Sequence, residues 1–147
     1  MRDQRGTMNS SSLLVRWRVC APYLLSVLRI MGAFTFMQFG TAKLFAFPAS
    51  ISPDGATVPL ASQMGVAGSL EACGGFLLLI GLFTRPVAFV LAGEMAFAYF
   101  IVHAPQSFWT MVNLGTEPVL FCFLWLYISS AGPGPWSLDA IFRRGRL

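Results

Sequence analysis

Hydrophobic residues fall in four continuous stretches of this chain, at about 20–44, 65–83, 86–104 and 112–131. Each stretch approaches the roughly 20 residues that an α-helix needs to cross a hydrocarbon core about 30 Å thick. The stretches lack the alternation of polar and apolar residues typical of strands, and they are longer than the strands of membrane barrels. The pattern therefore predicts an all-α fold, a transmembrane four-helix bundle.

Proline and glycine mark where the predicted helices end. The connection at 46–64 contains prolines and no Lys or Arg, whereas 83–86 (Phe-Thr-Arg-Pro) is a tight turn whose proline suits a helix start. Pro118 lies inside the fourth stretch, where it either kinks a longer helix or marks the first turn of a shorter one. The Gly-Pro-Gly-Pro segment at 132–135 ends the last helix.

The composition excludes an ordinary soluble domain. Hydrophobic residues make up 56% of the 147 residues and charged residues only 11%, whereas soluble domains carry about 25% charged residues. Too few polar side chains are present to cover the surface of a soluble domain of this size. The lipid bilayer is therefore the first partner that the sequence predicts.

The positions of the basic residues predict an orientation. The net charge is +4, but the Lys and Arg residues are not gathered on one face, so no nucleic-acid partner is expected. Most lie beside alternate ends of the stretches: Arg2, Arg5, Arg16, Arg18, Arg85, Arg143, Arg144 and Arg146. The positive-inside rule then places both termini and the middle turn in the cytoplasm. We expect a cytoplasmic segment at 1–19, a membrane domain at 20–131 and a cytoplasmic tail at 132–147, in the cell (inner) membrane.

Ionisable residues inside the predicted spans are candidate functional residues, because burying a charge in lipid is costly. They are Arg29, Lys43, Glu71, Glu94 and Glu117. Helical spacing places both cations of the first span on one face together with glycines, and the second span carries glycines beside its glutamate. Small residues allow helices to approach closely, so helix packing is predicted at Gly32, Gly40, Gly74 and Gly75.

Counting depth at 1.5 Å per residue from the predicted cytoplasmic ends suggests two polar groups. Arg29, Glu71 and Glu94 form a polar membrane core, with an expected Arg29–Glu94 pair. Lys43, His103 and Glu117 form an outer polar cluster, with an expected Lys43–Glu117 pair. Two interpretations stay open, because matched charges either hold helices in register or form a ligand, proton or redox site.

No motif for a metal, a phosphate or a nucleophile is found in the sequence, so catalytic residues stay unknown. His103 is the only histidine, and one histidine without a second ligand makes a poor metal or haem site. The cysteines Cys20, Cys73 and Cys122 contain no C-x-x-C pair, so no disulfide framework is indicated. Several phenylalanines follow one another near the end of the first span, and they either line a pocket for a quinone-like ring or face lipid: Phe34, Phe36, Phe39, Phe45 and Phe47.

The chain resembles the DoxX family of small four-helix membrane proteins over about residues 25–140. The matching segments are Arg29 with Gly32, Phe-Gly-Thr-Ala-Lys-Leu at 39–44, Leu-Glu at 70–71, the glycine-rich run at 74–85 ending in Gly-Leu-Phe-Thr-Arg, Glu94-Met95, His103, Gly-Thr-Glu at 115–117 and the segment 132–139. The resemblance implies a four-helix bundle and an association with membrane redox chemistry, in particular quinol oxidation, thiosulfate:quinone oxidoreduction and oxidative-stress complexes. Related branches handle thiols with paired cysteines, which this sequence lacks.

These observations lead to a ranked set of functional hypotheses. The first is an accessory subunit of a membrane redox or oxidative-stress system, associated with quinone and with membrane oxidoreductase subunits. The alternatives are a small transporter or proton-conducting protein and a purely structural helix bundle. Without a catalytic motif, we expect at most a subunit of an oxidoreductase complex. The sequence leaves a homo-oligomer open.

Overall fold

The computed structural model describes the backbone of residues 8–145, and the side chains of Val15 and of residues 17–145. The described chain is helical, with two long loops and no strand among these residues. In chain order the helices are α1 (Met8–Phe45), α2 (Gln63–Ile80), α3 (Thr84–Ala98), the π-helical segment η1 (Tyr99–His103), α4 (Thr116–Ala131) and α5 (Leu138–Arg144). Four of the arginines used to predict the orientation lie outside this description: Arg2, Arg5 and Arg146 entirely, and Arg16 by its side chain.

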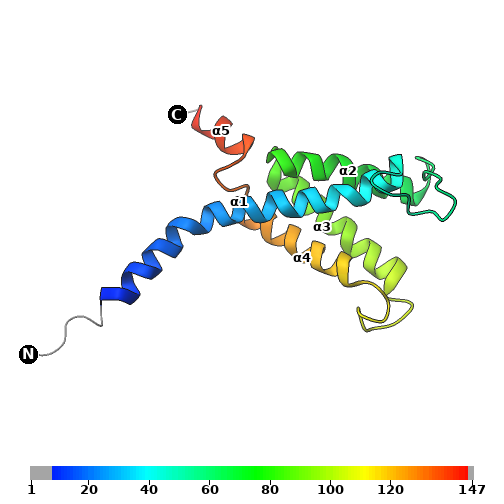
Figure 1. Ribbon diagram of the computed structural model, residues 1–147, viewed down its shortest axis with the longest axis horizontal. Helices are drawn as coiled ribbons and strands as arrows, with labels where there is room; N and C mark the ends of the chain where they lie inside the picture. Colours follow the sequence, from blue (N-terminus) through cyan, green and yellow to red (C-terminus); the bar gives the residue numbers. More distant parts are fainter. Residues whose placement is uncertain (1–7, 146–147) are drawn as a thin grey trace, which may run out of the picture.

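The helices pack as two antiparallel pairs, α1 with α2 and α3 with α4 (Figure 1). One end of the bundle holds the tight α2–α3 turn and the connection from α4 to α5, and we call it the turn end (residues 81–83 and 132–137). The opposite end carries the two long connections, and we call it the loop end (residues 46–62 and 104–115). The pairs diverge toward the loop end in this view.

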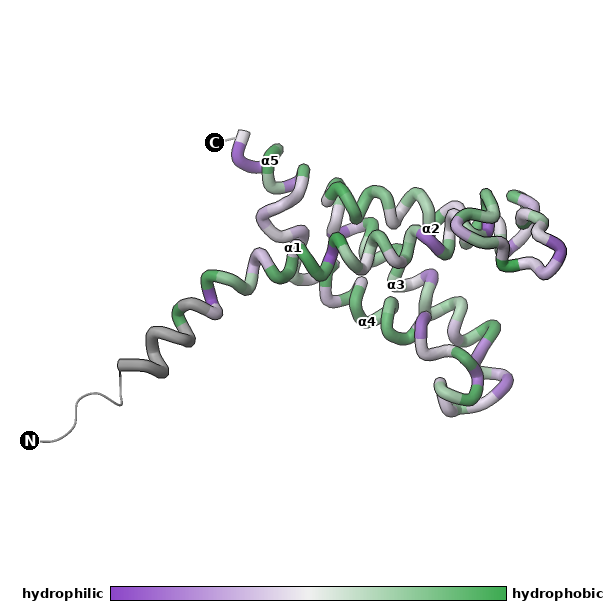
Figure 2. Tube along the Cα trace, viewed as in Figure 1, coloured by the Kyte–Doolittle hydropathy of each residue, from purple (hydrophilic) through white to green (hydrophobic). Residues whose placement is uncertain are grey.

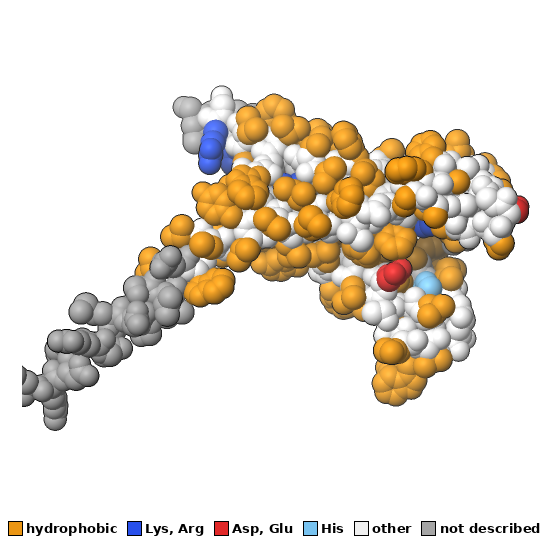
Figure 3. All heavy atoms as spheres, viewed as in Figure 1, with side chains coloured by type: hydrophobic (Ala, Val, Ile, Leu, Met, Phe, Trp, Pro, Cys, Tyr) orange, Lys and Arg blue, Asp and Glu red, His pale blue; other side chains and the backbone are white. Residues whose placement is uncertain are grey.

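Three helical segments are long and apolar enough to cross a membrane: Trp17–Phe45, Gln63–Ile80 and Thr84–His103. The fourth apolar helix, α4, has 16 residues and is shorter than these. Hydrophobic residues run along α1 to α4, whereas hydrophilic ones gather mainly in the loops and α5 (Figure 2). Apolar side chains cover most of the visible surface of the bundle (Figure 3). The protein is therefore a multi-pass membrane protein.

The helix limits differ from the predicted ones at both ends of the chain. The helix α1 begins at Met8, inside the segment expected to precede the first span, and Pro22 lies within it. Figure 1 shows the first part of α1 leaving the bundle at the turn end. The predicted tail at 132–147 contains the short helix α5. Pro118 lies in the first turn of α4, where its missing N–H is tolerated.

Local sequence explains how α2 begins and ends. The Ser62 hydroxyl accepts a hydrogen bond from the Gly65 N–H at 3.0 Å, which is a standard N-cap. Gly81 ends the helix in the left-handed region at φ 69°, and the Leu82 N–H then donates to the Leu77 carbonyl at 2.9 Å. A residue without a Cβ suits that conformation.

Glycines set the closest helix contacts, as the sequence predicts. A Cβ on Gly40 would lie 2.7 Å from the Gly68 carbonyl oxygen and 2.9 Å from the Ala72 Cα, so α1 meets the backbone of α2 there. Gly75 faces Met37, and Gly74 of α2 faces Leu91 of α3. Gly32 faces Leu124 and Trp125 of α4. All four predicted packing glycines therefore lie at helix contacts.

The core between the four helices is small and aromatic. Trp125 is fully buried, and its ring stacks on Phe121 at 5.8 Å between centroids and meets Phe36 edge-on at 5.4 Å. The rest of the buried cluster consists of three alanines, Leu78, Leu91, Met95 and Ile128. Phe36 thus packs in the core, while Phe34, Phe45 and Phe47 are exposed and Phe39 is partly buried.

We predict that Gly40→Ala lowers the stability of the bundle by about 1–3 kcal/mol, because the added methyl group meets the backbone of α2, which cannot move aside. The measurement is thermal unfolding in mild detergent, followed by circular dichroism. Gly93→Ala is the matched control, since a Cβ at Gly93 of α3 meets nothing within 4 Å. Equal melting temperatures for the two variants would contradict the close α1–α2 contact.

Candidate functional site

Arg29 of α1 is fully buried at the turn end, and its guanidinium binds only backbone carbonyl groups among the described residues. Its Nε donates to the Pro133 carbonyl at 2.8 Å. Its Nη1 donates to the carbonyls of Leu78 and, at 2.9 Å, Leu79. Its Nη2 donates to the Trp136 carbonyl. One side chain therefore joins α1, the end of α2 and the segment after α4.

The local backbone structure explains why these carbonyl groups are free to accept hydrogen bonds from Arg29. The last carbonyls of an α-helix have no partner within the helix, and they carry the negative end of the helix dipole. Leu78 and Leu79 lie in the last turn of α2, where a cation is favoured. The Gly-Pro-Gly-Pro segment forms no helix and leaves its carbonyls open for a donor. The fork of N–H groups on an arginine fits such a divergent set of acceptors.

Asp139 completes this junction from the other side. Its carboxylate accepts the N–H groups of Phe83 at 2.9 Å and Thr84 at 2.8 Å, so it caps the start of α3. Its own N–H donates to the Gly81 carbonyl at 2.9 Å, and its charge attracts Arg29. We call Arg29, Gly81, Pro133, Trp136 and Asp139 the turn-end junction.

Asp139 was missed in the sequence analysis, although part of its signal was present. Ser137 and Asp139 open α5 with a typical N-cap pattern, and the Ser137 hydroxyl accepts the Ala140 N–H at 3.1 Å. That pattern predicts local capping of α5. It does not predict that the carboxylate instead caps α3, which lies more than 50 residues away in the chain.

The predicted Arg29–Glu94 pair is wrong. Arg29 binds carbonyls at the turn end, and neither carboxylate oxygen of Glu94 has a hydrogen-bond partner. The error lies in the depth estimate, which counted from residue 20 as the membrane entry. Because α1 begins at Met8 and its first part lies outside the bundle, Arg29 is level with the end of α2.

Lys43 of α1 pairs with Glu71 of α2, and not with Glu117 as predicted. Its Nζ lies 2.5 Å and 2.6 Å from the two carboxylate oxygens, and the side chains are only 14% and 5% exposed. Gly68, one turn from Glu71, faces the stem of Lys43 and leaves room for it to lie along α2. Glu117 lies in the first turn of α4 and is exposed. Because α1 packs along α2 in the antiparallel direction, Lys43 pairs with Glu71 of α2 and not with Glu117 of α4.

Glu94 of α3 lies opposite this pair. Gly74 of α2 faces Leu91 of α3, so in an antiparallel register Glu71, three residues before Gly74, is level with Glu94, three residues after Leu91. Glu71 and Lys43 both act electrostatically on Glu94. Three helices thus bring Lys43, Glu71 and Glu94 to one level, and we call them the charged cluster.

Glu94 is the unusual member of the charged cluster. Both of its carboxylate oxygens are buried, yet neither has a hydrogen-bond partner among the described residues. An unsatisfied buried polar group is costly, and in a native protein it needs an explanation. A ligand, a water molecule or a proton at Glu94 would supply one.

His103 makes its side-chain contact with the loop that precedes α4. Its Nδ1 is 2.8 Å from the Asn113 carbonyl oxygen, so the ring joins η1 to the loop that precedes α4. No group of three or more His, Cys, Asp or Glu residues suited to a metal is present in the described chain. Among the described residues, no hydrogen bond or ion pair joins the three members of the predicted outer polar cluster, and Lys43 binds Glu71 instead. Cys20, Cys73 and Cys122 are free, and two of them, Cys20 and Cys73, are exposed.

We predict that Arg29→Met destabilises the bundle by at least about 3 kcal/mol, because several buried carbonyls lose a charged donor at once. Arg29→Lys should recover only part of this, since one ammonium group cannot reach acceptors on both α2 and the 132–137 segment. Thermal unfolding and protease cleavage between α4 and α5 provide the readouts.

The control for these variants is Arg18→Met, which removes an exposed cation from the same helix. It should change stability by no more than about 0.5 kcal/mol. If Arg29→Met unfolded at the wild-type temperature with its C-terminal segment still protected, the junction would not depend on Arg29.

Comparison with known proteins supports the membrane assignment. The DoxX family model matches residues 24–104, which is more than half of the chain. An uncharacterised protein of Haemophilus influenzae is 40% identical over 124 residues, covering 82% of this chain and 92% of that protein. Inner membrane protein YphA of Escherichia coli is 27% identical over 129 residues, covering 80% of this chain and 89% of that protein. No solved structure gives a significant match. The chain is a member of the DoxX family.

Proposed function

We propose that this protein is an accessory membrane subunit of a redox or oxidative-stress system, and that Glu94 is the group that meets its ligand. The observation that carries the proposal is the pair of buried Glu94 oxygens without a hydrogen-bond partner. Arg29 and Asp139 are fully engaged in the turn-end junction, and Lys43 is engaged with Glu71. Among the described residues, Glu94 is thus the ionisable side chain whose buried charged atoms have no hydrogen-bond partner.

A quinone in its reduced form fits this site by its chemistry. A quinol has hydroxyl groups that donate hydrogen bonds, and a carboxylate accepts them. Lys43 attracts a negative charge on Glu94, whereas burial and the neighbouring Glu71 oppose that charge. When bound, a quinone would supply electron transfer coupled to the uptake and release of protons. Membership of the DoxX family agrees with such a role.

We further propose that α4 is a fourth membrane span and that the turn end faces the cytoplasm. The described basic residues outside the charged cluster and Arg29 are Arg18, Arg85, Arg143 and Arg144, and they lie at or beyond the turn end. The positive-inside rule places that end in the cytoplasm. The name of the Escherichia coli relative supports the inner membrane as the location. Membrane oxidoreductase subunits are the proposed partners.

We predict that Glu94→Gln lowers the quinone content of the purified protein severalfold, because an amide is a weaker acceptor than a carboxylate. Protein purified in mild detergent is extracted with organic solvent, and quinone is quantified against protein. Co-purified proteins are identified in the same preparation. Glu117→Gln is the matched control, since Glu117 is an exposed glutamate at the loop end. Wild-type protein without quinone and without an oxidoreductase partner would refute the redox role.

Proton conduction is the second candidate, and the charged cluster favours it. Lys43, Glu71 and Glu94 come from three different helices and lie inside the membrane domain. Ionisable groups gathered within a membrane domain mark proton or ion pathways in many transporters. This candidate needs the same glutamate but no bound quinone.

We predict for this second candidate that the protein in liposomes dissipates an imposed pH gradient, and that Glu94→Gln reduces the rate at least tenfold, since the variant side chain cannot carry a proton. A pH-sensitive dye inside the liposomes measures the rate, with Glu117→Gln as the control. No flux above that of empty liposomes would eliminate proton conduction and leave the redox role untouched.

A further inference from the structure

A basic pocket lies at the turn end, beside the turn-end junction, with which it shares Pro133, and it contains no residue of the charged cluster. It has a volume of about 400 Å³, within the range of small-molecule sites. Three of its lining residues are arginines: Arg85 at the start of α3, and Arg143 and Arg144 at the end of α5. Its apolar lining includes Pro22 and Leu25 of α1.

The arginines of this pocket have unused donors. Arg85 uses Nη1 on the carbonyls of Ser129 at 3.0 Å and Ser130 at 2.6 Å, which leaves its Nε and Nη2 without a partner among the described residues. Arg143 and Arg144 are exposed and make no ion pair within the described chain. The acidic group of this region, Asp139, is occupied by α3. The pocket is therefore cationic and open to an anion.

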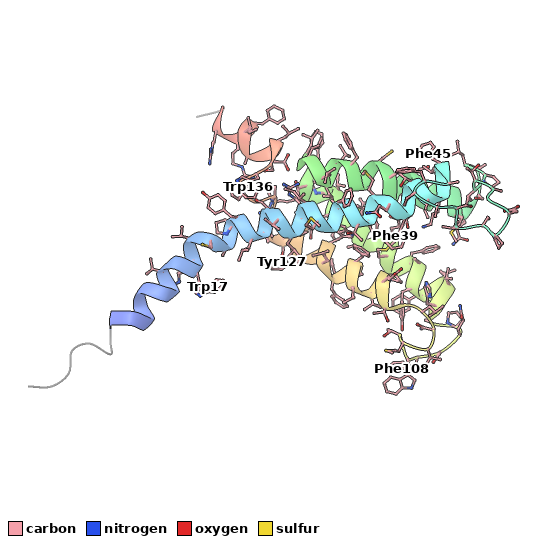
Figure 4. All side chains as sticks on the ribbon, viewed as in Figure 1. Trp17, Phe39, Phe45, Phe108, Tyr127 and Trp136 are labelled. Carbon is pink, nitrogen blue, oxygen red and sulfur yellow. The ribbon has the colours of Figure 1, made fainter. Side chains whose placement is uncertain are left out.

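A separate apolar groove lies next to the pocket on α1. The groove has a volume of about 540 Å³, and Leu25 lines both it and the pocket. From Leu25 the groove follows Leu28 and Met31 toward the middle of the helix, with Tyr127 of α4 as a further wall. Figure 4 shows Tyr127 beside α1. Six residues of helix correspond to about 9 Å of depth.

We infer that this pocket and groove bind one anionic phospholipid, with its phosphate among Arg85, Arg143 and Arg144 and one acyl chain in the groove. Arginine recognises phosphate through paired N–H donors. The position at the ends of α3 and α4 is where a lipid headgroup lies when those helices are in the bilayer. A cationic site next to an apolar groove, with Leu25 lining both, matches an anion with a hydrocarbon chain. A zwitterionic lipid would place its choline group among the arginines.

The test is titration of the full-length protein in mild detergent with phosphatidylglycerol and, separately, with phosphatidylcholine of the same acyl chains. Native mass spectrometry counts the bound lipid. We expect phosphatidylglycerol to bind at least roughly tenfold more tightly than phosphatidylcholine. Arg143→Gln and Arg144→Gln should each weaken phosphatidylglycerol binding about fivefold, as one lost cation near a lipid surface does. Arg18→Gln removes the same charge from α1 outside the pocket and should leave binding unchanged.

Two further arms distinguish a lipid from a free phosphate. Leu28→Trp fills the apolar groove and should weaken phosphatidylglycerol binding while every arginine remains. Inorganic phosphate in large excess should fail to displace the lipid. Equal binding of the two lipids, or equal loss with Arg18→Gln and Arg144→Gln, would overturn the proposal. Displacement by inorganic phosphate, together with no effect of Leu28→Trp, would overturn it in favour of a free-phosphate site.

Discussion

A guanidinium buried in a membrane protein needs hydrogen-bond acceptors for its N–H groups within the protein. The way in which Arg29 meets this constraint organises the fold. Its acceptors are carbonyls that two structural features leave open, the last turn of α2 and the non-helical segment after α4. Because these acceptors belong to different parts of the chain, satisfying one side chain fixes α1, α2 and the 132–137 segment together. Asp139 then caps α3 from the same segment. The turn end is therefore held by polar bonds, whereas the middle of the bundle is held by glycine contacts and the Trp125 core.

This use of Arg29 decides how the remaining charges are arranged. A cation satisfied by carbonyls does not neutralise a glutamate, so Glu71 and Glu94 share the single lysine that reaches them. Lys43 bonds to Glu71, and Glu94 is left with two unpartnered buried oxygens. The bundle thus separates a structural polar site at one end from a charged cluster nearer the other end. The proposed redox or proton role concerns only the second.

The four apolar helices, the packing glycines and the set of ionisable residues could be predicted from the sequence, because hydropathy and helical spacing are local properties. The pairing of charges could not. The hydrophobic stretch at 20–44 does not reveal which part of α1 contacts the other helices, and an error of a few turns moved Arg29 from the end of α2 to the level of Glu94. Hydropathy likewise does not show that backbone carbonyls at the end of α2 are free to accept, nor that Asp139 caps a distant helix. The Lys43 side chain also extends along α2 by about one turn, from Gly68 to Glu71. A depth estimated from Cα positions alone leaves out this reach of the side chain.

The central claim is that Arg29 is satisfied by carbonyls of the turn end and that Glu94 is not its partner. Solid-state NMR on the protein in lipid bilayers tests this directly, through dipolar couplings between the side-chain nitrogens of Arg29 and selectively labelled carbons. We expect a strong coupling from Arg29 Nε to the Pro133 carbonyl carbon, in line with the 2.8 Å hydrogen bond to its oxygen, and none to the Glu94 carboxyl carbon. A strong coupling to the Glu94 carboxyl carbon, with none to Pro133, would contradict the account.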